Sequence, residues 1–157
     1  FKENIIIGSF DSKNIPKKKF EIVVSISVIE HVNDPVDFIN NILKIIKPGG
    51  HLVLVTPNYD SLSRVFLQTK WHLFERPHLT FFGKDTIRKL LNDKGFKIES
   101  ITADKRTYPL SHFALYFSKW SSKLSKLLYG IVKILSIDRL HISLPSGSMV
   151  IFAKQIK

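Results

Sequence analysis

Cysteine is absent from all 157 residues of the chain, which excludes a disulfide framework and any cysteine-bound metal. The cellular compartment therefore cannot be read from cysteine chemistry. The chain also lacks the charged start and long apolar stretch of a signal peptide. It opens on Phe1 rather than on methionine and reaches the apolar run Ile5–Ile7 within a few residues. This start predicts a chain that is entered midway through a domain.

Acidic residues are scarce, with 13 Asp and Glu against 24 Lys and Arg. Such an excess of positive charge favours anionic partners such as nucleic acid, acidic lipid headgroups or acidic glycans. A lysine-rich surface without a specific partner explains it equally well, because the basic residues are dispersed along the chain. The composition is otherwise that of a soluble globular protein, and the length suits one domain with a sizeable core.

The first half of the chain has the pattern of a strand, a helix and a second strand. Residues 20–26 (FEIVVSI) and 51–56 (HLVLVT) are apolar at successive positions, as in parallel strands that are buried on both faces. Between them, residues 35–46 place apolar side chains at helical spacing. An Asp34-Pro35 start and a stop at residues 48–50 (PGG) delimit this helix. The pattern predicts a βαβ unit with a parallel crossover.

The same alternation continues to the end of the chain and predicts an α/β fold. The further predicted elements are strand 5–7, loop 11–19, helix 84–94 ended by Gly95, strand 96–102, an amphipathic segment 111–135 and strand 148–153. We expect a single domain in three parts: a core of strands and helices over 1–103, an amphipathic helical insertion over 104–147, and a last strand over 148–157.

The segment from residue 20 to residue 58 carries a set of motifs at characteristic spacing. They are Phe20-Glu21, Ile29-Glu30-His31-Val32, Asp34-Pro35, Ile46-Lys47-Pro48-Gly49-Gly50 and Thr56-Pro57-Asn58. This segment resembles the fourth strand, fourth helix and fifth strand of class I S-adenosylmethionine (SAM)-dependent methyltransferases. A later series, Pro77-His78-Leu79, Phe82 and Gly95-Phe96, is similar to methyltransferases of ubiquinone biosynthesis and of surface-polysaccharide gene clusters.

The resemblance implies a Rossmann-like sheet, mostly parallel with an antiparallel last strand, and SAM as the cofactor. The family's first strand ends in a glycine-rich loop against the cofactor, and its second strand ends in an acid that binds the ribose. Neither motif stands before Ile5. We therefore expect a sheet without its first strands and a chain that by itself binds SAM poorly.

Two strand ends match the cofactor-binding positions of the family. Ser9 and Phe10 follow strand 5–7, where Phe10 would stack on the adenine and Ser9 would replace a frequent Asp. Ser25, Ile26 and Ser27 end strand 20–26, and ligands of open α/β sheets bind at such carboxyl ends. A plain turn with a core phenylalanine is the alternative at Phe10.

Glu30 and His31 follow directly after strand 20–26. Some relatives bind a divalent metal here with a Glu-x-x-Glu-His set, but Ser27 replaces the first Glu, and a hard cation loses a strong ligand. We therefore expect no metal. Histidine is suited to removing a hydroxyl proton at neutral pH, so His31 is the candidate catalytic base. Local pairing of Glu30 and packing of His31 are the alternative.

Trp71, His72 and His78 lie in an aromatic- and histidine-rich loop after strand 51–56, where an acceptor would enter. Such a loop suits contact with a sugar or an aromatic ring. A lid or a hydrophobic anchor without direct contact explains it equally well.

The segment 111–135 aligns Phe, Trp, Leu and Ile along one stripe, with Lys119, Lys123, Lys126 and Lys133 off it. Its apolar residues do not run long enough to span a bilayer. A basic amphipathic helix of this kind suits a membrane interface or a homo-oligomer contact. A helix that covers the active site is the alternative.

These observations predict a SAM-dependent methyltransferase that acts on a small-molecule or glycan acceptor, most simply at oxygen. The alternatives are a metal-dependent RNA 2′-O-methyltransferase and a non-catalytic interaction or membrane-docking domain. We expect no nucleic-acid partner, because a stripe of basic and aromatic residues is missing. The expected location is the cytoplasm, with membrane association through 111–135 as an option.

Overall fold

The computed structural model describes residue 10, residues 20–109, residue 111 and residues 121–156. The chain divides into two compact units. The first takes in Phe1–Asp104 and Gly147–Lys157, and the second takes in Lys105–Ser146. The predicted strand 5–7, the predicted loop 11–19 and Ser9 lie outside the described residues.

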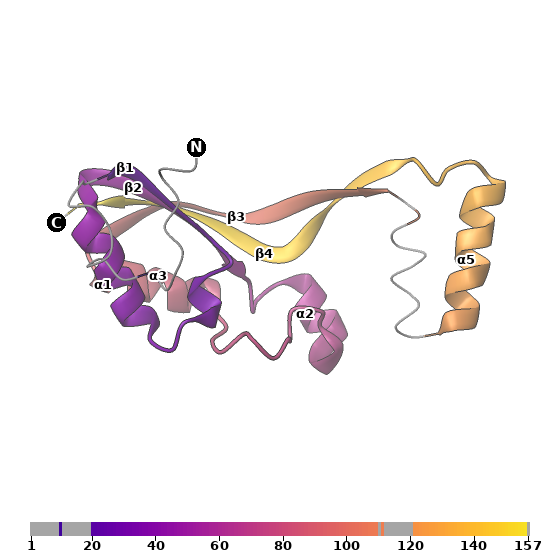
Figure 1. Cartoon of the computed structure of the whole chain (residues 1–157), viewed down its shortest axis with the longest axis horizontal. Coiled ribbons are helices and arrows are strands. Elements are labelled where there is room, and N and C mark those ends of the chain that lie inside the picture. Colours follow the sequence, from indigo (N-terminus) through magenta and orange to yellow (C-terminus); the bar gives the residue numbers. More distant parts are fainter. Residues whose placement is uncertain (1–9, 11–19, 110, 112–120, 157) are drawn as a thin grey trace. The chain divides into compact units, whose positions relative to one another are not determined.

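Four strands form one mixed sheet in the order β1-β2-β4-β3 (Figure 1). They are β1 (Phe20–Ile26), β2 (Ile46–Pro57), β3 (Phe96–Pro109) and β4 (His141–Gln155). β1 and β2 are parallel, and β2 pairs antiparallel with β4 from His51 opposite Lys154 to Pro57 opposite Ser148. The expected α/β sheet with an antiparallel last strand is confirmed. It is mixed rather than mostly parallel over the described residues.

The helix of the βαβ unit, α1, runs from Pro35 to Ile45. The Asp34 carboxylate caps it by accepting the backbone N–H groups of Val36 (2.8 Å) and Asp37 (3.1 Å), as expected for Asp before Pro. β2 begins at Ile46, so the Pro-Gly-Gly stretch belongs to the start of the strand. A Cβ atom on Gly50 would lie 2.9 Å from the Lys47 carbonyl oxygen and 3.0 Å from that of Glu21, so glycine lets β1 and β2 approach here.

Among the other helical elements, α3 (Lys84–Asp93) begins and ends close to where the pattern places it, whereas α2 (Leu62–Leu67) and η4 (Gln68–Lys70) lie in a stretch that the sequence predicts as irregular. α3 is followed by Gly95 at φ 81°, a left-handed residue that ends the helix. The remaining elements are η3 (Ile29–His31) and α5 (Ser122–Ile134). Among the described residues, no helix is long and apolar enough to span a membrane.

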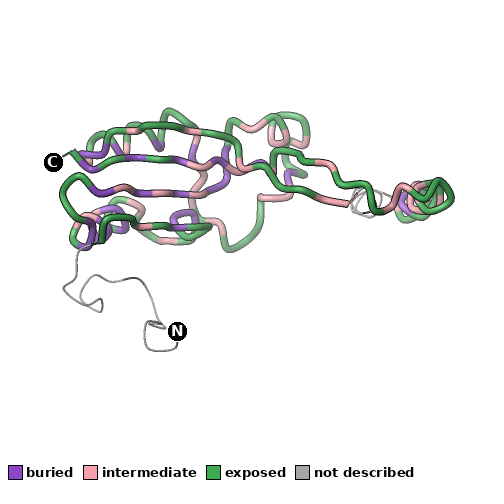
Figure 2. The backbone as a smooth tube through the Cα atoms, turned by 90° about the horizontal axis from the view of Figure 1, so that it is seen from above, coloured by how far each residue is buried: buried purple, intermediate pink, exposed green. Residues whose placement is uncertain are grey.

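The core of the first unit lies on one face of the sheet. α1 and α3 both contribute to it, through Ile39, Ile42, Ile87 and Leu91, together with Leu52, Leu54, Met149, Ile151 and Ala153 of the strands. Figure 2 shows the buried positions alternating with less buried ones along the strands. The prediction that β1 is buried on both faces is wrong for the described residues: Ile22, Val24 and Ile26 are exposed, because α1 and α3 cover only the other face.

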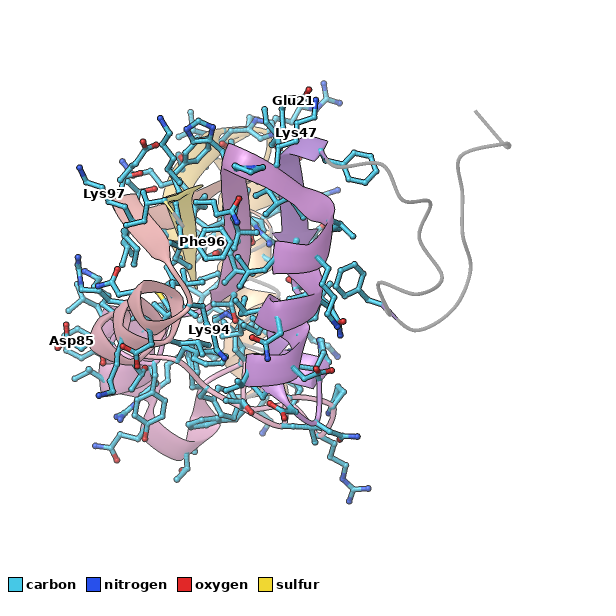
Figure 3. The ribbon with its side chains drawn as sticks, turned by 90° about the vertical axis from the view of Figure 1, so that its left-hand side faces the viewer. Glu21, Lys47, Asp85, Lys94, Phe96 and Lys97 are labelled. Carbon is cyan, nitrogen blue, oxygen red and sulfur yellow. The ribbon has the colours of Figure 1, made fainter. Side chains whose placement is uncertain are left out.

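An ion pair joins the first residues of β1 and β2, at the amino-terminal end of β1. Lys47 Nζ contacts the Glu21 carboxylate, and Figure 3 shows the two labelled side chains together. The hydrogen bond from Lys47 lowers the pKa of Glu21. Any stabilisation is thus present above the ordinary pKa of a glutamate and is lost as the pH falls. Both groups are largely exposed to water, so the pair contributes little.

Candidate functional site

The carboxyl end of β1 places the three expected cofactor residues in different environments. Ser25 is buried, whereas Ile26 is 60% exposed. Ser27 adopts a left-handed backbone with φ 52°, and its N–H donates to the Val55 carbonyl oxygen at 2.9 Å. This left-handed residue turns the chain out of the strand and into η3, which carries Glu30 and His31.

Phe10, Ser25 and Ile26 line one shallow apolar depression beside β1. It is completed by Val23, Val24, Val28, Phe38 and Ile42. Phe10 packs edge-on against Phe38, with ring centroids 5.3 Å apart. The structure therefore brings three of the five expected cofactor residues together. Ser27 does not line this depression, and Ser9 lies outside the described residues.

The depression is smaller and less polar than a complete small-molecule site. Its volume is about 160 Å³, whereas sites that enclose a ligand measure roughly 300–1,000 Å³. Ser25 is the one lining residue with a polar side chain, and its Oγ has no hydrogen-bond partner among the described residues. The described residues thus offer an apolar wall but no charged or amide side chain for a cofactor's ribose or carboxylate.

Glu30 is buried directly beside this strand end. Its side chain is 1% exposed, and Thr56 Oγ1 of β2 donates to its Oε2 at 3.1 Å. Its Oε1 is buried without a partner among the described residues. A buried polar atom is nearly always satisfied, so the unpaired carboxylate oxygen of Glu30 is a candidate contact for a ligand or a water molecule.

His31 and His78 face each other across the same site. His31 Nδ1 lies 2.8 Å from the Pro77 carbonyl oxygen, and His78 Nδ1 lies 2.6 Å from that of Leu73. A carbonyl oxygen only accepts, so each neutral ring is assigned its proton on Nδ1 and keeps a lone pair on Nε2. The ring centroids are 4.7 Å apart. Both imidazoles therefore carry proton-accepting or ligating nitrogens whose orientation the backbone sets.

Two further hydrogen bonds tie the loop that carries His78 to η3. The backbone N–H groups of Leu79 and Thr80 both donate to the Glu30 carbonyl oxygen, at 2.7 Å and 3.2 Å. Residues 30–31 and 77–80 thus form one hydrogen-bonded corner, although nearly fifty positions separate them in the sequence. The sequence predicts His31 as a catalytic base and His78 as an acceptor contact, with His78 beside Glu30 and His31 as a conceivable third ligand for Zn²⁺, and the structure brings the three residues together.

Glu30, His31 and His78 also form a candidate metal cluster. One ligand atom from each residue lies within 4.8 Å of the others. The set offers one carboxylate and two imidazoles, whereas Mg²⁺ requires a near-octahedral shell of oxygen ligands. Ser27 adds no carboxylate, so these residues do not fit a hard divalent cation. One carboxylate with two imidazoles is instead a known ligand set for Zn²⁺.

Trp71 and His72 lie in the loop after β2, as the sequence predicts, but in unequal environments. Trp71 is 2% exposed, and its Nε1 donates to Ser63 Oγ at 3.1 Å. Its ring packs edge-on against Phe74, with centroids 5.2 Å apart. His72 is half-buried, with its ring 6.3 Å from that of Trp71. The loop was expected either to contact the acceptor or to act as a lid or hydrophobic anchor. The burial of Trp71 supports the role of an anchor.

Some residues of the site were not singled out from the sequence. Thr56 supplies the hydrogen bond to Glu30, and Phe38 and Val28 line the apolar depression. Thr56 stands in the Thr-Pro-Asn motif, and Phe38 lies on the apolar stripe of α1, so both carried a sequence signal. Their pairing with Glu30 and Phe10 needed the structure.

Comparison with known proteins shows which family the chain belongs to. A family model described as a methyltransferase domain matches residues 2–101. The chain is 29% identical over 107 residues to the mitochondrial ubiquinone biosynthesis O-methyltransferase of Schizosaccharomyces pombe, covering 61% of the chain and 37% of that protein. It is 28% identical over 120 residues to an uncharacterized protein of Methanocaldococcus jannaschii, covering 76% and 53%. The chain thus spans about half, or less, of the length of these relatives.

Solved structures show the same fold. A methyltransferase of Bacillus halodurans described as putative aligns with a TM-score of 0.57 and 19% identity, over 94% of this chain and 76% of that one. A SAM-dependent methyltransferase of Thermotoga maritima aligns with a TM-score of 0.56 and 17% identity, over 98% and 66%. Because the family model also covers well over half of the residues, this chain belongs to the class I SAM-dependent methyltransferases.

Proposed function

We propose that the whole protein transfers a methyl group to a hydroxyl oxygen of a small-molecule or glycan acceptor, with His31 as the general base. The observation that carries this proposal is the corner made by η3 and the loop at Pro77–Thr80. There, His31 keeps a free Nε2 beside the strand end where Ser25 and Ile26 line the apolar depression. An oxygen acceptor of this kind must lose a proton, and His31 offers a place for it.

The chemistry assigns a distinct task to each group. SAM, when bound, supplies a methyl group on a sulfonium sulfur, which keeps the electron pair of the broken S–C bond. We propose that Phe10, Ser25 and Ile26 hold the cofactor, with Ser9 and Ser27 as further candidates. His31 Nε2 takes the hydroxyl proton as the acceptor oxygen forms its bond to the methyl carbon. Positioning of the two reactants supplies several kcal/mol of the rate enhancement in such displacements, on the order of 7–11 kcal/mol at best.

The acceptor side of the site is proposed to use His72 and His78. Both side chains are half-buried and keep part of their surface in reach of a ligand. The His78 ring also lies beside the His31 ring, 4.7 Å away and tilted by 48°, so an acceptor that contacts His78 brings its hydroxyl group near His31 Nε2. Trp71 is proposed to act indirectly, by fixing the loop on which these histidines stand.

The proposal is tested by methyl transfer from labelled SAM to three acceptor classes: catechols, hydroxylated sugars and total RNA. We expect transfer to one of the two small-molecule classes, and we expect EDTA or 1,10-phenanthroline to leave the rate within about twofold. The single carboxylate of the cluster argues against a Mg²⁺-dependent transfer, and the chelators also test Zn²⁺, which this ligand set could hold. Methylation confined to RNA would replace the proposed acceptor class. Activity that is lost with chelator and restored by Zn²⁺ would overturn the expectation of metal-free transfer. It would leave the proposed acceptor class unchanged.

The 157-residue chain by itself should bind SAM weakly. The reason is that the described residues provide a wall of about 160 Å³ with one serine hydroxyl, rather than an enclosed and polar site. Isothermal titration calorimetry should detect no complex at concentrations on the order of tens of micromolar. The whole protein should bind under the same conditions. A micromolar dissociation constant for this chain would show that it holds the complete cofactor site.

A further inference from the structure

The second unit exposes apolar side chains where a helix packed on a core would bury them. α5 places Leu124, Leu127, Ile131, Ile134 and Leu135 three to four positions apart, which is the spacing of one helix face. Their exposed fractions run from 42% for Leu124 to 83% for Ile134. The buried residue of this helix is instead a polar one, Ser125, at 4% exposure. Within the described part of this unit, the apolar stripe of α5 is therefore exposed while a polar residue of the helix is buried.

The charge beside this stripe has one sign. Lys123 and Lys126 are exposed on α5 and form no ion pair with any described residue. Lys133 is also exposed and lies over the Tyr129 ring, 5.6 Å from its centroid. Residues 105–146 contain seven lysines and arginines but one acid, Asp138. The exposed stripe thus shares α5 with exposed lysines, in a unit whose sequence is strongly basic.

We propose that this face of α5 docks on the surface of an anionic phospholipid bilayer. Leucine and isoleucine side chains would enter the boundary between headgroups and acyl chains, and the flanking lysines would contact anionic headgroups, as in interfacial amphipathic helices. A symmetric contact with a second copy would bring two such lysine-bearing helices together without compensating acids. An RNA partner would favour aromatic side chains among the lysines, whereas the described part of the stripe, on α5, is aliphatic. The docking is independent of the identity of the methyl acceptor.

The test is co-sedimentation of the 157-residue chain with phosphatidylcholine vesicles that contain either no or one-third phosphatidylglycerol. We expect binding to the anionic vesicles, little binding to the neutral ones, and a loss of about tenfold between 0.1 M and 0.5 M NaCl. Leu127→Ser/Ile134→Ser should weaken binding by about tenfold or more. Lys123→Gln/Lys126→Gln changes no apolar contact and should weaken binding to the anionic vesicles by about tenfold.

Ile134→Ser and Ile156→Ser form a matched pair, because both isoleucines are exposed and they lie in different units. Only Ile134→Ser should weaken vesicle binding, and circular dichroism should show that both variants stay folded. Equal binding of the two variants would overturn the proposal, as would absence of binding to anionic vesicles. A dimer in solution that Leu127→Ser/Ile134→Ser dissociates, without vesicle binding, would show a second copy as the occupant. Tight RNA binding that Lys123→Gln/Lys126→Gln abolishes, without vesicle binding, would show a nucleic-acid surface.

Discussion

Replacing His31 by alanine in the whole protein should lower turnover by about 100-fold or more, while the dissociation constant for SAM changes by less than about twofold. The expected loss follows from removing Nε2, the nitrogen that the Pro77 contact leaves free to take a proton. The affinity for SAM should stay nearly unchanged, because His31 does not line the apolar depression with Phe10 and Ile26. Steady-state kinetics together with calorimetry on the same preparation measure both quantities.

Two further variants complete the test: His31→Asn separates a catalytic base from a structural support, and Ile26→Asp tests whether the depression holds the cofactor. His31→Asn keeps an N–H group that can donate to the Pro77 carbonyl oxygen but has no equivalent of Nε2, so it should be as inactive as His31→Ala. Ile26→Asp places an anion in the depression and should raise the SAM dissociation constant by about tenfold or more. If His31→Asn restores activity, His31 supports the loop and is not the base. Unchanged SAM affinity of folded Ile26→Asp would place the cofactor elsewhere.

Trp71→Ala should destabilise the 157-residue chain by about 3–5 kcal/mol. Trp71 is 2% exposed, and its Nε1 donates to Ser63 Oγ at 3.1 Å, so truncation leaves a cavity and removes a hydrogen bond. A Cβ atom on Gly147, at the φ 90° turn in β4, would lie 3.3 Å from the same Nε1. The indole therefore fills the space between its loop and β4. The free energy of unfolding, from urea denaturation followed by circular dichroism, measures the effect.

Leu79→Ala is the control for this prediction, because Leu79 is 57% exposed in the same loop. It should change the free energy of unfolding by less than about 0.5 kcal/mol. Trp71→Phe keeps part of the ring volume without the N–H group and should fall between the two. A Trp71→Ala variant as stable as Leu79→Ala would contradict the anchor role and would return Trp71 to the acceptor side.

The sequence predicted the bounds of α1 and α3 closely, because their signals are local. Asp34 before Pro35 predicts the start of α1, and Gly95 predicts the end of α3, since a cap or a left-handed residue acts within one helical turn. The pattern did not predict the extent of β3 and β4. β3 continues to Pro109, and β4 begins at His141, well before the apolar run at its end. Pairing between strands extends β3 and β4 beyond the apolar segments by which the sequence marks buried residues.

Burial on both faces was the prediction that failed, and the reason is tertiary. An apolar residue at every position of β1 shows that both faces of the strand can be buried, but it does not show what covers them. Among the described residues, α1 and α3 pack on one face of the sheet, and Ile22, Val24 and Ile26 are exposed. The apolar stripe of α5 is a second example. Its helical periodicity is visible in the sequence, but its exposure to solvent is visible only in the structure.

By itself, the sequence determined the family, the cofactor and the strand end at which Ile26, Glu30 and His31 stand, because these depend on residue types at short spacing. Only the tertiary structure decided that His78 faces His31, that Thr56 holds a buried Glu30 and that Trp71 is closed off from solvent. Those contacts join residues from 8 to 47 positions apart. Two of them are hydrogen bonds between side chains, and the two imidazoles that face each other are each held by a backbone carbonyl group. Every residue carries a backbone carbonyl group, so no residue type in the sequence signals that those of Pro77 and Leu73 orient the two histidines.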